Sequence, residues 1–327
     1  MKIASKKILS FAGFLPALLF FVFAFGGGAA AQSYMQDMKR QSARSDKLTG
    51  GKIEKAALVR GGDNLKITIN VPAFQMTLWQ NGKEIKTYQV GVGLKEYPIY
   101  VGFRQASEII WNPSWIPPDS DWVEGSKKVK AGEIILPTDE RNPLGKMKIS
   151  LGYNYLIHQA KGINDLGNLV SHGCVRVMQA DLYDLAEKIV AARELDVAPE
   201  QIAEAKATKK TLVAELDPVI PVEITYDTLV VEAGKLRIYP DVYERKTNTV
   251  ETLRAELASS GVDASNLDEA TLKKMLALAT AKKQFVISVK NIETGKALTG
   301  GQTLPVVTTA ATQTRPKIPV RKRKALR

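Results

Sequence analysis

Ser171-His172-Gly173-Cys174-Val175-Arg176 contains the only cysteine of this 327-residue chain and one of its two histidines. The other histidine, His158, precedes His172 by fourteen residues. A thiol, a proton acceptor and a glycine beside the thiol are the groups that nucleophilic catalysis by cysteine requires. This stretch therefore predicts a catalytic centre, and the remaining sequence is interpreted as the scaffold that carries it.

Two histidines compete for the role of the base that activates the thiol. A cysteine attacks as thiolate and is mostly protonated at neutral pH, so a neighbouring histidine must take its proton. On a strand His172 points to the same face as Cys174, but the backbone between them limits their approach. His158 belongs to another predicted strand, so we expect it to be the base and His172 to be a supporting donor. Gly173 leaves the backbone N–H groups near Cys174 free to stabilise an oxyanion.

Two other interpretations of the same residues stay open at this point. His158, His172 and Cys174 are acceptable zinc ligands, but the sequence offers no obvious fourth ligand and the His-x-Cys pair is crowded. The cluster could also be structural, because a free cysteine often serves as a small buried hydrophobic residue. A single cysteine excludes an internal disulfide in either case.

The first thirty-one residues have the pattern of a secretory signal peptide. Three lysines precede an apolar segment at residues 11–25, and three alanines at residues 29–31 provide a small-residue cleavage site. A membrane span needs roughly twenty apolar residues, so cleavage is favoured over an uncleaved inner-membrane anchor. We expect an exported protein of the periplasm or cell envelope.

The net charge of +12 lies mainly at the two ends of the chain. Three lysines precede the apolar segment, and seven basic residues without an acid lie between Arg315 and Arg327. A basic run of this kind binds polyanions, so the tail is expected to contact an anionic envelope surface. The alternative is a solvated tail without a specific role. Nucleic acid is not an expected partner, because export separates the protein from it.

Alternating apolar residues predict a series of short strands between Leu65 and His158. Asn81-Gly82 between two of them predicts a type I′ hairpin, which needs positive φ at both positions. Apolar residues spaced i, i+3 and i+7 over residues 182–190 predict one amphipathic helix. Further strands and helices are expected between residues 196 and 291, among them a helix over residues 267–283. This order of elements indicates a β-rich α+β fold.

Residues 111–122 hold three of the four tryptophans together with three prolines. Proline interrupts regular structure, so these residues predict a stiff loop with large aromatic surfaces. Its tryptophans are expected either to line a substrate groove or to fasten the loop onto the sheet.

The combination of His158 with Ser171-His172-Gly173-Cys174 resembles the signature of the L,D-transpeptidases that have a YkuD-type catalytic domain. Asn142-Pro143-Leu144-Gly145 and Asp181-Leu182-Tyr183 are similar to the Gram-negative, ErfK/YbiS-like branch of that family. The resemblance implies a mixed β-sandwich with one flanking helix. The predicted segments are a signal peptide at 1–31, a flexible leader at 32–62, the catalytic domain at 63–195, accessory strands and helices at 196–291, and a disordered basic tail at 292–327.

The resemblance implies Cys174 as the nucleophile and His158 as its base. The base would be oriented by the backbone carbonyl of Gln159, where many members of the family have glycine. His172 and Gly173 would lie around the oxyanion. No metal and no cofactor are implied.

Three further residues are assigned to the surroundings of the site. Ser171 would shape the loop by a hydrogen bond to the backbone rather than take part in the reaction. Arg176 would support the site or bind a substrate carboxylate, with a surface ion pair as the alternative. Trp115 would contact the substrate.

The implied reaction is acyl transfer on the tetrapeptide stems of peptidoglycan. Cys174 would attack the bond between the third residue and D-alanine, so that D-alanine leaves and a thioester forms. An amine from a second stem would resolve the thioester as a 3→3 cross-link, or an amine of a protein would attach that protein to the wall. The alternatives are an L,D-carboxypeptidase, in which water resolves the thioester, and a non-catalytic protein that binds the cell wall.

Overall fold

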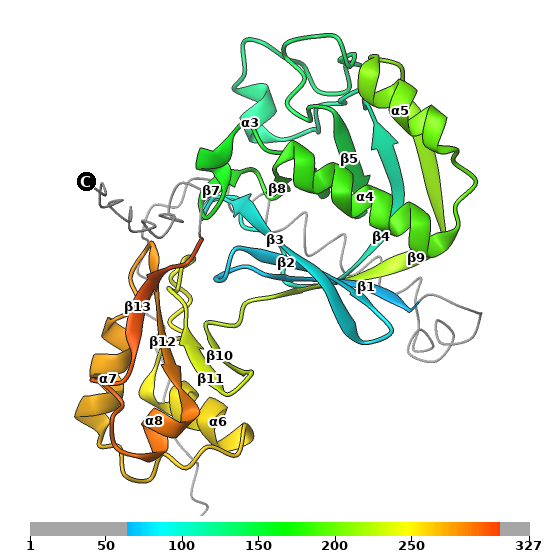
Figure 1. The fold of residues 1–327 in the computed structure, drawn as a ribbon. Helices are drawn as coiled ribbons and strands as arrows, with labels where there is room; N and C mark the ends of the chain where they lie inside the picture. The colour runs from blue at the N-terminus through cyan, green and yellow to red at the C-terminus, as the bar shows by residue number, and fades with distance from the viewer. Residues whose placement is uncertain (1–63, 308–327) are drawn as a thin grey trace, which may run out of the picture. The chain divides into compact units, whose positions relative to one another are not determined.

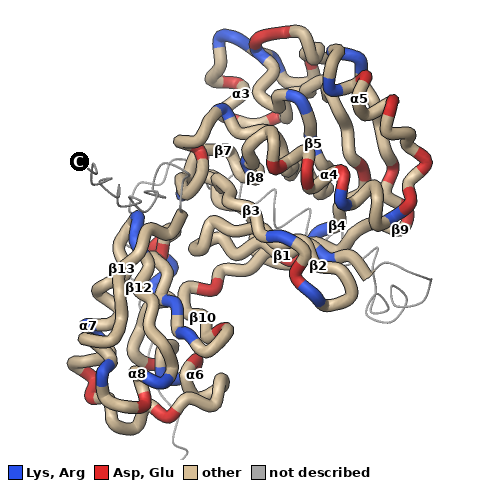
Figure 2. The backbone as a smooth tube through the Cα atoms, viewed as in Figure 1, with Lys and Arg blue, Asp and Glu red and all other residues tan. Residues whose placement is uncertain are grey.

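The computed structural model of the protein describes residues 64–307 (Figure 1). The predicted signal peptide, the leader up to residue 62 and the basic run from Arg315 lie outside the described residues. Among residues 64–307, none of the helices combines the length and the apolar character needed to cross a membrane. Basic and acidic residues are interspersed along the described chain (Figure 2), in keeping with the neutral body that the sequence predicts.

Nine strands form one mixed sheet in the order β2-β1-β9-β4-β5-β6-β8-β3-β7. The strands are β1 Leu65–Asn70, β2 Gln75–Gln80, β3 Lys83–Gly93, β4 Gly102–Trp111, β5 Met147–Ser150, β6 Leu156–Gln159, β7 Leu169–Ser171, β8 Val175–Val177 and β9 Leu212–Thr225. Because β2 also pairs with β3, the sheet closes on itself and its inward side chains share one core. Ile67, Ile109 and Ile157 are fully buried there. The predicted β-rich fold is confirmed.

The opening hairpin confirms the sequence prediction for Asn81-Gly82. The φ angles are +53° at Asn81 and +74° at Gly82, as a type I′ turn requires. The turn pairs β2 with β3 antiparallel, and a register shift follows at Leu78 and Trp79. Inward and outward residues alternate strictly along β1, because every second side chain of a strand faces the core.

The predicted amphipathic helix is α4, Gln179–Arg193, which begins directly after β8. It buries Leu182, Leu185 and Ile189, the residues whose spacing predicts it. A second helix, α5 Pro199–Ala207, begins at a proline, whose missing N–H costs nothing at that position. The Asn112 side chain at the end of β4 donates hydrogen bonds to the carbonyls of Ala205 at 2.6 Å and Lys210 at 2.9 Å.

The main sheet extends beyond the predicted domain boundary at residue 195. Strand β9 lies between β1 and β4, parallel to β1 and antiparallel to β4. Without β9 these two strands would have unpaired edges inside the core, so the strand belongs to the sheet and not to an accessory region.

The remaining strands form a four-stranded antiparallel sheet in the order β10-β11-β12-β13. Its elements are β10 Leu229–Glu232, β11 Lys235–Ile238, β12 Lys283–Ser288, β13 Gln302–Pro305 and the helices α6 Val250–Ser259, α7 Glu269–Ala277 and α8 Val289–Glu293. Leu236, Leu253, Leu272 and Phe285 belong to its own hydrophobic core.

Two predictions made from the sequence differ from the structure of this four-stranded sheet and its helices. The helix expected over residues 267–283 ends at Ala277, because Lys283 already belongs to β12. The segment expected to be disordered from residue 292 contains β13, which pairs with β12 along its whole length. Its Gly- and Thr-rich composition carries no sign of order, and the strand forms because a partner edge is available.

Candidate active site

Strand β6 carries His158, and its neighbour β8 begins directly after Cys174. These strands are parallel neighbours, with Ile157 opposite Val175 and His158 opposite Arg176. Cys174 directly precedes β8, which begins at Val175. Side chains two residues apart on a strand share a face, and His158 lies opposite Arg176, two residues after Cys174.

His158 is a buried and neutral imidazole. Only 4% of the residue is exposed, and burial lowers its pKa to about 4, with the positive charge of Arg176 acting in the same direction. The backbone carbonyls of Gln159 and Leu144 oppose this shift and raise the pKa. Nδ1 makes no hydrogen bond of good geometry to any described residue. At neutral pH the ring is therefore free to accept a proton.

Cys174 holds a protonated thiol at neutral pH. The residue is partly exposed, but the surrounding protein desolvates the thiol and raises its pKa to about 11. A backbone hydrogen bond from Leu156 and the charge of Arg176 act in the opposite direction. Sγ lies 3.9 Å from the carbonyl oxygen of Asn154. At neutral pH the thiol of Cys174 and the imidazole of His158 are therefore both uncharged.

The turn before the cysteine has one conformation available to it. Gly173 has a φ of +105°, which lies in a backbone region that L-residues with a side chain rarely adopt. The Ser171 hydroxyl donates to the carbonyl of Cys174 at 2.6 Å, across the turn. A Cβ at Gly93, at the end of β3, would lie 3.0 Å from the Gly173 Cα and would collide with the Tyr97 carbonyl. The turn is packed closely enough to fix the direction of its N–H groups.

Arg176 has a carboxylate partner inside the protein. Its Nη1 donates to the Asp165 carboxylate at 3.0 Å, and the two side chains are only 11% and 14% exposed. The same Asp165 oxygen accepts from the backbone N–H of Lys161 at 2.8 Å. A buried pair of this kind is costly to break, by roughly 3–5 kcal/mol when one partner is removed. This arrangement favours support of the site over capture of a substrate carboxylate.

Aromatic rings enclose His172 on two sides. The Trp122 ring stacks on the imidazole with 4.3 Å between centroids and 11° between planes. The Tyr97 ring meets it edge-on at 4.6 Å. Trp115 stacks on Trp122 at 6.2 Å and forms the outer layer. Burial, followed by the charges of Arg176 and Lys161, lowers the pKa of His172.

Trp111, Trp115 and Trp122 lie in two different environments. Trp111 is buried at the end of β4 and fastens the loop to the sheet. Trp115 and Trp122 belong to the wall beside His172. Trp122 and Tyr97, which touch the ring directly, were not among the predicted site residues. The grouping of tryptophans was a signal for Trp122, whereas nothing in the sequence marked Tyr97.

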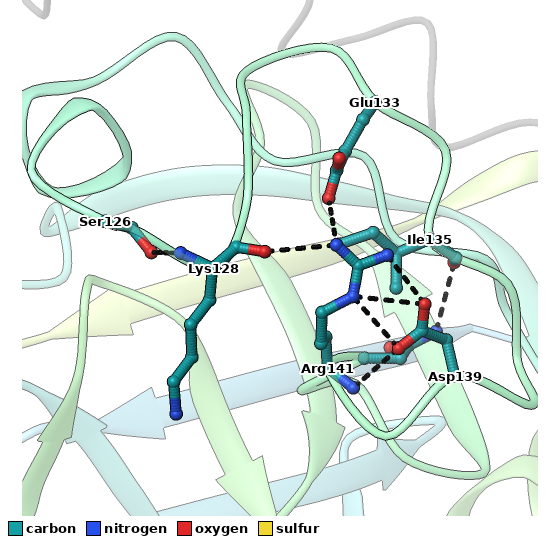
Figure 3. Close-up of polar contacts among 7 residues, drawn as sticks. Ser126, Lys128, Glu133, Ile135, Asp139 and Arg141 are labelled. Carbon is teal, nitrogen blue, oxygen red and sulfur yellow. Dashed lines mark hydrogen bonds and ion pairs between the residues drawn. The ribbon is translucent and has the colours of Figure 1, made fainter.

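The loop at residues 112–146, which we call the tryptophan loop, is braced by its own polar contacts (Figure 3). Arg141 is the centre of this bracing. Its guanidinium donates to the Asp139 carboxylate at 2.7 Å, to the Glu133 carboxylate at 2.9 Å and to the Lys128 carbonyl at 3.0 Å. Within the same loop, Asn142 Nδ2 donates to the Pro113 carbonyl at 2.9 Å.

Gln159 uses its side chain to hold the end of this loop. Its Oε1 accepts a hydrogen bond from the backbone N–H of Lys146 at 2.7 Å. Gly145, with φ of +71°, lies against the same side chain, and a Cβ there would lie 2.5 Å from Oε1. The Gln159 side chain thus fills the space beside Gly145. The backbone carbonyl of Gln159 raises the pKa of His158.

These groups suit attack on an acyl carbon by a thiol with proton transfer to a histidine. A neutral histidine lies on the strand next to the one that follows the thiol, and a glycine with positive φ directly precedes the thiol. Within residues 64–307, no three His, Cys, Asp or Glu side chains are grouped so that they could hold a metal ion.

Comparison with known proteins points to one family. Residues 64–220 match the family model of the YkuD L,D-transpeptidase catalytic domain. The protein named "Probable L,D-transpeptidase YbiS" of Escherichia coli strain K12 is 31% identical over 77 residues, which cover 24% of this chain and 25% of that protein. The protein of the same name from Escherichia coli O6:H1 matches equally. The match thus spans about a quarter of the length of these curated relatives.

Solved structures give a more distant likeness. An L,D-transpeptidase from Mycobacterium smegmatis is 12% identical with a TM-score of 0.31, over 50% of this chain and 59% of that chain. L,D-transpeptidase 3 from Mycobacterium tuberculosis is 14% identical with a TM-score of 0.31, over 50% and 62%.

Proposed function

Because residues 64–220 belong to the YkuD family of L,D-transpeptidase catalytic domains, we propose that this protein transfers acyl groups between peptidoglycan stem peptides through a thioester on Cys174. The observation that supports the proposal is the β6–β8 pairing, in which His158 lies opposite Arg176, two residues after Cys174. The donor is a tetrapeptide stem that ends in D-alanine.

In the acylation step, Sγ of Cys174 attacks the carbonyl carbon of the third stem residue while His158 takes the thiol proton. The negative charge that develops on the carbonyl oxygen is stabilised by backbone N–H groups of the Gly173–Cys174 turn. The C–N bond to D-alanine then breaks. His158 returns its proton to the departing amine, and the acyl group remains on the sulfur as a thioester.

In the second step, an acceptor amine attacks the thioester and His158 takes its proton. The new amide bond forms as the C–S bond breaks, and the proton passes to the sulfur, which restores the neutral thiol. An amine of a second stem gives a 3→3 cross-link, and an amine of a protein attaches that protein to the wall. Water in place of the amine gives the carboxypeptidase reaction.

The pKa values of the two groups determine how the proposed acylation begins. The pKa of about 11 for Cys174 and of about 4 for His158 make a preformed thiolate–imidazolium pair unfavourable. The substrate carbonyl must therefore be in place when the proton moves. This coupling protects the thiol from other electrophiles while the site is empty, since the thiolate is the reactive form.

The proposal also locates the reaction outside the cytoplasm. Residues 1–31 act as the signal peptide and the protein works in the periplasm, where it contributes to cell-wall assembly and cell shape. The basic run from Arg315 binds anionic wall polymers or membrane surfaces. Intact mass spectrometry of the protein from the periplasmic fraction tests the first point, because cleavage leaves a chain that begins at Gln32.

The reaction is tested by incubating the mature protein with tetrapeptide-stem muropeptides and identifying the products by mass spectrometry. Cross-linked dimers together with free D-alanine support the transferase. Tripeptide and D-alanine without dimers identify the hydrolase instead. A Cys174→Ala variant should release no D-alanine, and turnover equal to that of the wild type in this variant would refute the mechanism.

A further inference from the structure

A caged arginine lies on β4, outside the residues already assigned to the reaction. The guanidinium carbon of Arg104 lies 4.7 Å from the ring centroid of Tyr100, 5.5 Å from that of Tyr153 and 5.3 Å from that of Tyr155. We call these three residues the tyrosine cage. Cation–π contacts of this kind orient a guanidinium but leave its N–H edges unused.

Arg104 has no acidic partner among residues 64–307. Its Nη1 donates to the Phe103 carbonyl at 3.2 Å, and its buried Nε has no hydrogen-bond partner among these residues. Two acids near Arg104 in the sheet, Glu108 on β4 and Glu223 on β9, already have partners. Glu108 accepts from Ser150 at 2.5 Å, and Glu223 pairs with Lys66 at 2.5 Å.

The tyrosine cage connects directly to the nucleophile. Tyr153, Asn154 and Tyr155 are consecutive in the turn between β5 and β6. The flanking tyrosines contact Arg104, and the carbonyl of Asn154 lies 3.9 Å from Sγ of Cys174. Tyr153 and Asn154 have φ of +50° and +62°, so a tight turn fixes the directions of these side chains.

The cage is open to solvent on one side. Tyr155 is buried, but Tyr100 is 43% exposed and Tyr153 is 50% exposed. A guanidinium that is held in place, partly desolvated and without an anion offers a planar pair of donors that matches a carboxylate. A carboxylate bound there would lie on the Asn154 side of the sulfur.

We propose that Arg104 binds a carboxylate of the donor stem peptide and so sets which peptide bond lies over Cys174. This inference rests on the proposed function, because it identifies the donor as a carboxylate-bearing peptide. Two sources share the required chemistry: the terminal carboxylate of D-alanine, and a side-chain carboxylate of the third stem residue where that residue has one. In both cases Arg104 determines specificity and does not take part in the bond changes.

The test separates binding from turnover. In the Cys174→Ala background, the dissociation constant of a tetrapeptide donor is measured by calorimetry with and without Arg104→Met. The same donor is then used with an amide in place of the terminal carboxylate, and again with an amide in place of the side-chain carboxylate. We expect Arg104→Met to weaken binding of the unmodified donor roughly 10- to 100-fold, the range for a lost charged hydrogen bond. Arg104→Lys should recover part of this, since an ammonium keeps the charge but loses the paired geometry.

The amidated donors identify the bound group. When the amide replaces the carboxylate that Arg104 recognises, the Cys174→Ala protein should bind the donor equally well with and without Arg104→Met. When the amide replaces the other carboxylate, Arg104→Met should still weaken binding. Lys66→Met removes a positive charge from the same sheet at a residue already paired with Glu223, and it should leave binding unchanged.

Two outcomes overturn the inference. One is an equal loss of binding by Arg104→Met for the unmodified donor and both amidated donors, which would make Arg104 a structural brace of the tyrosine cage. The other is a failure of the Cys174→Ala protein to bind any donor. Tight, carboxylate-dependent binding without turnover in the wild type would refute the proposed reaction but support the site.

Discussion

The β6–β8 pair and the tryptophan loop both contribute to the site, but different forces hold them. His158 lies on β6 and Cys174 directly before its partner strand β8, among fully buried residues such as Ile157 and Val175. The tryptophan loop presents Trp122 to His172 and is braced by Arg141, whose side chain is 42% exposed. Water screens the second set of contacts and not the first.

Two different structural features therefore position the groups of this one site. The distance between base and nucleophile depends on strand register, which changes only if the sheet core changes. The orientation of His172 depends on a wall that can move without disturbing the core. We therefore expect changes to the strand pair to affect the chemistry most, and changes to the loop to affect it in proportion to their contact with His172.

After removal of the nucleophile itself, the largest expected effect comes from His158→Gln. The variant keeps a polar side chain of similar size but loses the proton acceptor, so the rate of D-alanine release in the first turnover should fall by about 10²- to 10⁴-fold. Rapid-quench measurement of this burst reports acylation alone. A loss below tenfold would show that another group is the base. The strand pair would then not affect the chemistry more than the tryptophan loop does.

The same residue gives a stability signature with a defined sign. The folded-state pKa of His158 is about 4 and its ordinary value is 6.5. Between these values the unfolded chain binds a proton that the folded protein does not, so stability falls as the pH decreases from 6.5 to about 4. The loss should approach ~3 kcal/mol. Urea denaturation at pH 7 and pH 4.5 should show it in the wild type and much less in His158→Gln.

The sequence predicted the strand pair better than the loop for a physical reason. Alternation of apolar residues is a local property, so it predicted β1 and the strand that carries His158. Asn81-Gly82 predicted its turn because the φ requirement is local too. The choice of His158 over His172 as the base rests on the same kind of local strand geometry and stays a prediction.

Contacts set by tertiary pairing were not predicted. Asp165 meets Arg176 because the short η1 helix, Ile163–Asp165, packs over β3 at Gly91, where a Cβ would collide with the Asp165 carbonyl. Strand β9 joins a sheet whose other members lie far earlier in the chain. Tyr97 reaches His172 through a loop without a regular pattern. In each case the partner is distant in sequence.

The third prediction concerns the contact between the loop and His172. Trp122→Ala removes the ring that stacks on the imidazole, and a stacked aromatic pair contributes about 0.5–1.5 kcal/mol. We expect the acylation rate to fall up to about tenfold, with the donor KM changing less because the loss acts on His172. Trp122→Phe should restore most of the rate.

Trp115→Ala provides the graded control for this prediction. Trp115 stacks on Trp122 and not on His172, so its loss should reduce the acylation rate less than Trp122→Ala does. If Trp115→Ala instead raises the donor KM and leaves the burst rate unchanged, the outer tryptophan contacts substrate, as the sequence predicted. An effect of Trp122→Ala as large as that of His158→Gln would contradict the distinction between the strand pair and the loop.

The smallest expected effect comes from Arg141→Gln, which removes the brace without touching His172. Exposed ion pairs contribute little each, so acylation should slow by less than about threefold, while limited proteolysis should cut within residues 112–146 sooner. Salt screens such pairs, so in molar NaCl the wild-type loop should become nearly as susceptible as that of the variant. Arg237→Gln, in the four-stranded sheet, should change neither measurement. If Arg141→Gln slows acylation as much as Trp122→Ala, then the exposed brace and not the aromatic stack determines where His172 lies.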